Sequence, residues 1–143
     1  MCVLRVTSET TSFAAFLRDT GFPAYQSHEK DEISTTGKRK PYDDYGFSSS
    51  VSECDWNNLA GQIEDANAFL RTHERTLRKL LSSHDITDIR LDFPYSCRLD
   101  EHIFMQCDYL PSDFLKLAGD LGIGIELSHY ALADEEENSE PGA

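Results

Sequence analysis

The side chains in this sequence that could carry out chemistry are histidines, cysteines and carboxylates scattered along the chain. The five histidines form no H-x-x-x-H or H-E-x-x-H pair, and the four cysteines form no C-x-x-C pair, so the spacings of common metal and redox sites are missing. The one compact group is Asp100-Glu101-His102, a carboxylate–imidazole cluster that could move a proton or bind a metal. Because it lies in a short polar stretch, we expect a solvated turn there instead.

Motifs for acyl, phosphoryl and dinucleotide chemistry are also missing. There is no G-x-S-x-G, no P-loop and no G-x-G-x-x-G. Gly122-Ile123-Gly124 follows a predicted helix and enters a predicted strand, which is the wrong context for a phosphate cradle. We therefore predict that the protein is not an enzyme and holds neither a cofactor nor a metal.

The chain is strongly acidic. Its 26 Asp and Glu residues against 13 Lys and Arg residues give a formal net charge of −13. Residues 134–140 carry five of the negative charges, and the rest of the chain stays acidic without them. An acidic surface repels nucleic acid and attracts basic proteins. We expect a basic protein partner and no nucleic acid.

One basic run, Lys38-Arg39-Lys40, comes shortly before Tyr42 and Tyr45. Basic side chains beside aromatic rings can bind a phosphate or a single nucleic-acid strand. On so acidic a chain a solvated loop is the favoured interpretation, and a local contact with an acidic partner is the alternative.

The elements that must position these residues follow from the hydrophobic pattern. Residues 2–7 are rich in β-branched types and place Cys2, Leu4 and Val6 on one face of a strand. Thr11 or Ser12 can cap a short helix that ends at Gly21.

The middle of the chain is dominated by one long helix. Two modest strands flanking an exposed loop are predicted between residues 24 and 55. Asp55 can then cap a helix whose apolar stripe starts at Trp56 and recurs at steps of three and four residues to Leu81.

The last third of the chain predicts a hairpin, a helix and a strand. Residues 89–95 alternate as a half-buried strand, and Pro94 indicates an edge position or an early end. Residues 103–109 are expected to be its hairpin partner, followed by a helix at 111–122 and a last strand at 123–127.

This order, β-α-β-β-α-β-β-α-β, predicts an α+β fold with an antiparallel or mixed sheet and helices packed on one face, as in ferredoxin-like domains. Residues 1–132 form the single predicted domain, and residues 133–143 form an acidic low-complexity tail. An exposed edge at the Pro94 strand, or the open sheet face, would allow a homodimer.

The other face of the sheet is then open to solvent and to partners. Alternation places seven polar side chains on it: Arg5, Arg90, Asp92, Gln106, Asp108, Glu126 and Ser128. The candidate partner-binding residues combine this face with the long helix. They are Asp88, Arg90, Asp92, Asp108 and Glu126 on the sheet and Glu64 and Asp65 on the helix.

The sequence also bears on location and redox state. No apolar run reaches the roughly 18–20 residues needed to span a bilayer, and the N-terminus lacks the basic and apolar regions of a secretory signal. We expect a soluble cytoplasmic protein. The cysteines are expected to be free thiols with structural roles, most clearly Cys2, Cys97 and Cys107 in predicted strands.

The succession of elements resembles the bacterial domain of unknown function 4279. The residues that carry the resemblance are the opening strand Val3–Thr7, the helix end at Leu17–Gly21, Pro23, the helix from Trp56, and the closing segment Leu117–Tyr130. The likeness extends over nearly all of residues 1–130. It implies a small accessory or immunity-type bacterial protein, with no catalytic residues to assign.

Two functions from different classes follow. The first is a non-enzymatic protein-binding module, most concretely an immunity protein that neutralises a basic toxin by covering its active-site or substrate-binding surface. The alternative is a small-ligand-binding or regulatory domain that uses the open sheet face or a pocket under the loop from Lys38 to Tyr45.

Overall fold

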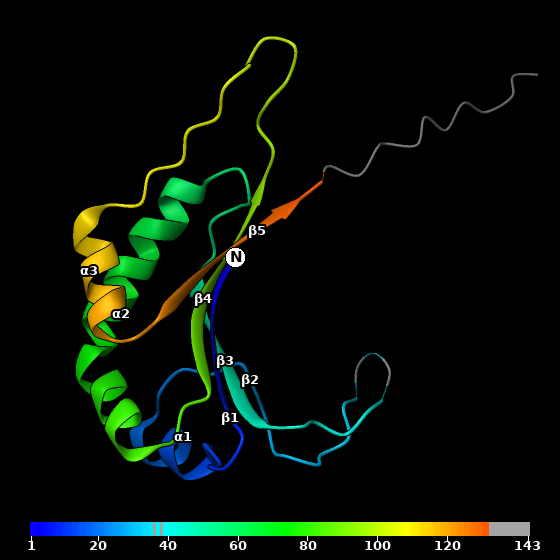
Figure 1. Cartoon of the computed structure of the whole chain (residues 1–143), viewed down its shortest axis with the longest axis vertical. Coiled ribbons are helices and arrows are strands. Elements are labelled where there is room, and N and C mark those ends of the chain that lie inside the picture. The colour runs from blue at the N-terminus through cyan, green and yellow to red at the C-terminus, as the bar shows by residue number, and fades with distance from the viewer. Residues whose placement is uncertain (36, 38, 132–143) are drawn as a thin grey trace, which may run out of the picture.

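The computed structural model describes residues 1–35, 37 and 39–131, which form three helices and a five-stranded mixed sheet in the order β2-β3-β1-β4-β5. Figure 1 shows α2 and α3 against one face of this sheet, so the predicted α+β class with helices on one face is confirmed. The element bounds are β1 (Cys2–Ser8), α1 (Ala14–Thr20), β2 (Gln26–His28), β3 (Tyr45–Ser52), α2 (Leu59–Ser83), β4 (Asp88–Ser96), α3 (Ser112–Asp120) and β5 (Gly124–Tyr130).

β1 is the central strand of the sheet, and alternate residues along it are apolar. Cys2, Leu4 and Val6 are fully buried, as their spacing predicts. β1 pairs antiparallel with β3 on one side and with β4 on the other. The two modest strands expected between residues 24 and 55 are β2 and β3, which also pair antiparallel.

α1 ends at a glycine, as predicted. Gly21 has φ 64°, a left-handed conformation that suits a residue without a Cβ, and its N–H donates to the Leu17 carbonyl at 3.1 Å. At the other end the Oγ of Ser12 accepts from the N–H of Ala14 at 3.2 Å. The N-cap is Phe13, which makes no side-chain cap hydrogen bond, so the prediction of Thr11 or Ser12 as the cap is wrong.

α2 starts later than the sequence predicts. Its cap is Asn58, whose side chain accepts from the N–H of Gly61 at 3.0 Å, and not Asp55. Trp56 consequently lies outside the helix, where its ring stacks on Tyr130 with centroids 4.6 Å apart. The rest of the stripe behaves as expected, because Leu70, Leu77 and Leu80 are fully buried against the sheet.

The predicted strand at 103–109 is wrong, and with it the nine-element order. β4 is flanked by β1 on one side and by β5, which runs parallel to it, on the other. Both of its edges are therefore taken, and residues 97–111 form a long loop without helix or strand before α3. α3 is the crossover that parallel neighbours need.

The edge position inferred from Pro94 is also wrong for the strand as a whole. β4 lies inside the sheet and runs on to Ser96, with Pro94 buried and aligned with Ser128 of β5. Its pairing with β1 stops at Asp92, so Pro94 lies beyond the antiparallel ladder. A residue without an N–H is tolerated there because the neighbour on that side has ended.

Two further predictions concern the acidic tail and membrane-spanning segments. The acidic tail predicted at 133–143 lies outside the described residues, so the boundary at 132 stays a prediction. Within the described part of the chain, no helix combines the length and the apolar character needed to cross a lipid bilayer.

Candidate functional site

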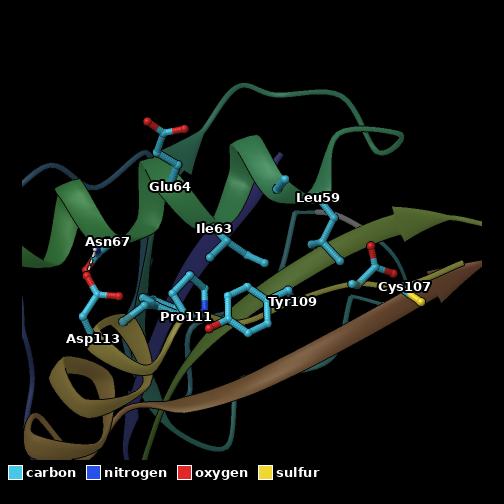
Figure 2. A pocket seen from close by; sticks show the side chains of 11 residues that line it. Leu59, Ile63, Glu64, Asn67, Cys107, Tyr109, Pro111 and Asp113 are labelled. Carbon is cyan, nitrogen blue, oxygen red and sulfur yellow. Dashed lines mark hydrogen bonds between the residues drawn. The ribbon is translucent and has the colours of Figure 1, made fainter.

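A groove of about 450 Å³ lies between α2 and residues 107–114 (Figure 2). Its floor is apolar: Leu59 and Ile63 of α2 point toward Tyr109 and Pro111 of the facing segment, and the fully buried Phe114 also lines it. A hollow of this size fits a side chain or a small molecule.

The spacing of residues on α2 explains why this floor exists. Leu59 and Ile63 are four residues apart and so lie on the same side of the helix. Pro111 directly precedes α3, where its fixed φ directs the facing segment into the helix, and Phe114 follows one turn later.

The rim of the groove is acidic and polar. Asp113 accepts hydrogen bonds from Asn67 and Arg71, each at 3.3 Å. The Oδ1 of Asn67 is buried and has no partner within the described residues, so an acceptor is left for an incoming donor. Glu64 also lines the groove and forms no ion pair or hydrogen bond within the described part of the chain.

Residues 97–111, hereafter the projecting loop, extend away from the body beside this groove (Figure 1). Its apolar side chains face solvent: Phe104 is 93% exposed, Tyr109 77% and Met105 67%. Exposed apolar residues that gather on one segment indicate an interaction surface, since such exposure is unfavourable in water.

Side-chain hydrogen bonds hold the projecting loop together. The N–H of Arg98 donates to Gln106 Oε1 at 2.7 Å, Gln106 Nε2 donates to Asp108 at 3.0 Å, and Arg98 forms an ion pair with Asp108. Burial alone would raise the pKa of Asp108, but the bonds from Gln106 and Arg98 and the charge of Arg98 outweigh burial and lower it.

The tip of the projecting loop is the turn expected at Asp100-Glu101-His102. Asp100 Oδ1 accepts from the N–H groups of His102 and Ile103, each at 2.7 Å. Its own N–H donates to the Ile103 carbonyl at 3.0 Å. The carboxylate of Asp100 thus closes the turn and exposes the residues that follow.

The open face of the sheet, away from the helices, carries charges that are paired with one another. Arg90 contacts Asp88 at 2.6 Å and Glu126 at 2.7 Å, and these hydrogen bonds raise its pKa. Asp92 accepts from Arg5 at 3.4 Å and from Ser128 at 2.6 Å. Because Arg5 aligns with Arg90 and Asp92 with Glu126, the ion pairs Arg5–Asp92 and Arg90–Glu126 run diagonally between neighbouring strands.

The structure brings together only some of the predicted partner-binding residues. Asp88, Arg90, Asp92 and Glu126 lie together on the open face. Asp108, expected there with Gln106, lies in the projecting loop, because residues 103–109 form no strand.

The two predicted helix acids also separate. Glu64 lines the groove, whereas Asp65 accepts from Ser52 Oγ at 2.7 Å and from the Cys54 thiol at 3.4 Å. Asp65 therefore ties α2 to the end of β3 and is engaged within the fold.

The sequence interpretation missed the apolar residues of the groove and the projecting loop. One signal was present: Ile103, Phe104 and Met105 are three consecutive apolar residues, which breaks the alternation of a half-buried strand. Leu59 and Ile63 carried no separate signal, because their spacing is that of ordinary core residues.

All four cysteines are free thiols, as expected. Burial raises the pKa of the Cys2 thiol, which makes it unreactive at neutral pH. Cys107 is exposed and lines the groove, so its predicted place in a strand is wrong.

A second hollow, of about 370 Å³, lies at the loop between β2 and β3, where a ligand pocket was the alternative prediction. Arg39, Lys40 and Tyr42 line it, and Lys38 lies outside the described residues. Tyr42 stacks on His28 with ring centroids 3.9 Å apart, and His28 contacts Asp44 at 2.8 Å. These contacts order the loop from within.

Comparison with known proteins adds no relative: no family model, no curated protein and no solved structure matches this chain. The resemblance to the bacterial domain of unknown function 4279 stays a prediction from the residues quoted above. Function must therefore be argued from the surfaces of this molecule.

Proposed function

We propose that this protein is a non-enzymatic binding module that captures a basic protein partner between α2 and the projecting loop. The observation that carries the proposal is the exposure of Phe104, Met105 and Tyr109 beside an apolar groove with an acidic rim. Buried aromatic anchors supply most of the energy of protein interfaces, and charges around them select the partner.

Charge complements this arrangement. The chain carries a net charge of −13, and Glu64, Asp108 and Asp113 all line the groove. A partner that places an apolar side chain between Leu59 and Tyr109, with lysine or arginine around it, would satisfy both parts of the surface. The free Oδ1 of Asn67 would accept one of its donors.

An immunity protein that neutralises a basic toxin is the most concrete form of this proposal. Toxins that act on nucleic acid carry basic active-site surfaces, and an acidic protein finds such a surface quickly by electrostatic steering. The resemblance to an immunity-type bacterial family points in the same direction. On this proposal the acids of the open face contribute to the long-range field, and the projecting loop makes the close contacts.

We propose further that the first six elements form a ferredoxin-like unit. They follow the order β-α-β-β-α-β, and the antiparallel pairs β1 with β3, β1 with β4 and β2 with β3 support this assignment. α3 and β5 then extend the unit by one parallel strand.

A second candidate function is small-ligand binding in the same groove. Its volume of about 450 Å³ falls within the range of roughly 300–1,000 Å³ usual for ligand pockets. A metabolite that raises the melting temperature of the wild-type chain would favour this candidate.

The test is capture of the partner from lysate of the source organism by the tagged chain at low and high salt, with mass spectrometry of the bound proteins. We expect one basic protein, shed as salt rises, and lost when Phe104→Ser and Tyr109→Ser are combined. The matched control combines Tyr25→Ser and Ile33→Ser, since these residues are 57% and 63% exposed elsewhere. Equal capture by both double variants would contradict the proposal.

A further inference from the structure

The outer edge of β5 is a second surface with the features of an interface. β5 is the last strand of the sheet, seven residues long, and no described residue pairs with its outer side. It contains no proline or lysine, and its register with β4 has no bulge. Proteins usually protect exposed edges with such devices, so this edge is open to another strand.

The opposite edge of the sheet differs. β2 is only three residues long, and the long loop between β2 and β3 follows it directly. A short strand offers few hydrogen bonds to an incoming chain. The β5 edge is therefore the better template for pairing.

We propose that a second copy of this chain pairs antiparallel with β5 about a two-fold axis at Leu127, which joins two sheets into one. Leu127 is the middle residue of β5, so this register alone places all residues from Gly124 to Tyr130 opposite a residue of the partner strand. The pairing is isologous, as a two-fold interface requires.

The side chains are complementary in this register. Tyr130 stacks on Trp56 with one face of its ring and is still 47% exposed, and it would lie opposite Gly124 of the second copy, where even a Cβ would meet nothing closer than the Ile89 carbonyl oxygen at 3.7 Å. An aromatic ring that covers a cross-strand glycine is a known stabilising arrangement. Leu127, 45% exposed, would pack against Leu127 of the second copy on the face of the sheet that the helices cover.

The charges on β5 itself select the same register and argue against a basic occupant. With the axis at Leu127, Glu126 faces Ser128 of the second copy, whereas an axis at position 126 would place two glutamates directly opposite each other. Glu126 is already paired with Arg90 at 2.7 Å. The edge therefore offers no free carboxylate to a basic strand, and a second copy is the better match.

The test is sedimentation of the full chain, together with variants at the axis. The wild type is expected to sediment at twice the 16.2 kDa mass of the chain and to dissociate on dilution. Leu127→Lys and Leu127→Glu should each halve that mass, because like charges would face each other at the axis. An equimolar mixture of the two variants should restore the dimer, since lysine would then face glutamate.

The matched control is Leu115→Lys, because Leu115 is also 45% exposed but lies on α3. It should leave the dimer intact, and circular dichroism should show that every variant is folded. A wild type that is monomeric at all concentrations, or a mixture that stays monomeric, would overturn the proposal. Neither result bears on partner capture, which uses a different surface.

Discussion

The open face of the sheet and the groove beside α2 are both acidic, but only the groove keeps an unpaired carboxylate beside apolar side chains. On the open face Arg90 contacts two carboxylates, and Arg5 a third. At the groove Asp108 and Asp113 are also held by arginine, but Glu64 forms no ion pair or hydrogen bond within the described residues, and an apolar floor lies next to it. Glu64 therefore remains available to a partner, whereas Asp88, Asp92 and Glu126 on the open face are all paired.

The difference shows that net charge alone does not locate a binding surface. Exposed ion pairs contribute little to stability, and a carboxylate already held by arginine attracts a partner less than a free one. Acidity counts for recognition where it surrounds apolar groups that a partner can bury. In this chain that combination occurs where the projecting loop meets α2.

The largest effect is expected at the floor of the groove, because it is also part of the core. Phe114 is fully buried and packs edge-to-face on Phe93 with ring centroids 6.0 Å apart. Phe114→Ala should lower the free energy of unfolding by about 3–5 kcal/mol through lost contacts and a cavity. Urea denaturation of the wild type and the variant measures this difference in free energy.

Phe104→Ser is the matched control for that substitution, since Phe104 is 93% exposed. It should change the free energy of unfolding by less than about 0.5 kcal/mol. Equal losses from the two variants would show that the projecting loop is a structural part of the fold, and the contrast between floor and loop would fail.

The next effect separates the two acidic faces directly. Glu64→Lys should weaken binding of the captured partner about tenfold, or about 1.4 kcal/mol, because an unpaired carboxylate at the rim is replaced by a repelling charge. Glu126→Lys on the open face should change the affinity by less than about threefold, since Glu126 is engaged by Arg90. Titration calorimetry at low and moderate salt measures both, and a larger effect at Glu126 would reverse the assignment of the faces.

Much of the fold could be predicted because hydrophobic periodicity is local. Cys2, Leu4 and Val6 alternate as a central strand should, and α2 shows a long apolar stripe. Its first turn was misplaced because Asp55 and Asn58 are both good caps, and only tertiary contacts decide between them. For the same reason the sequence places Trp56 inside the helix, whereas in the structure it precedes the helix.

The neighbour of β4 could not be predicted, because alternation does not say which strand pairs with which. Residues 105–109 and β5 both alternate, and the parallel crossover through α3 places β5 beside β4. Asp108 and Gln106 were consequently assigned to the open face. The acids that the sequence placed correctly, Asp92 and Glu126, belong to strands whose pattern and register agree.

The smallest predicted effect is a difference in response to acid, which arises on the helix side. His73 of α2 packs its ring on Phe22 and Phe69, with centroids 5.0 and 4.5 Å away, and burial lowers its pKa. An unfolded chain protonates this histidine near pH 6.5, whereas the folded chain resists protonation until lower pH. Stability should therefore be fully present above pH 6.5 and fall as the pH drops toward the lowered pKa.

His73→Phe should remove this dependence, because a phenyl ring keeps the aromatic contacts and does not titrate. The stability that the wild type loses relative to the variant between pH 7 and 5 should stay below about 1 kcal/mol, since solvent screens a partly exposed ring. Urea midpoints across that range measure it. His102→Asn is the control, because the His102 side chain is 83% exposed and should leave the wild-type profile unchanged. If the stability of His73→Phe depended on pH as the wild type does, the acid sensitivity would come from residues other than His73.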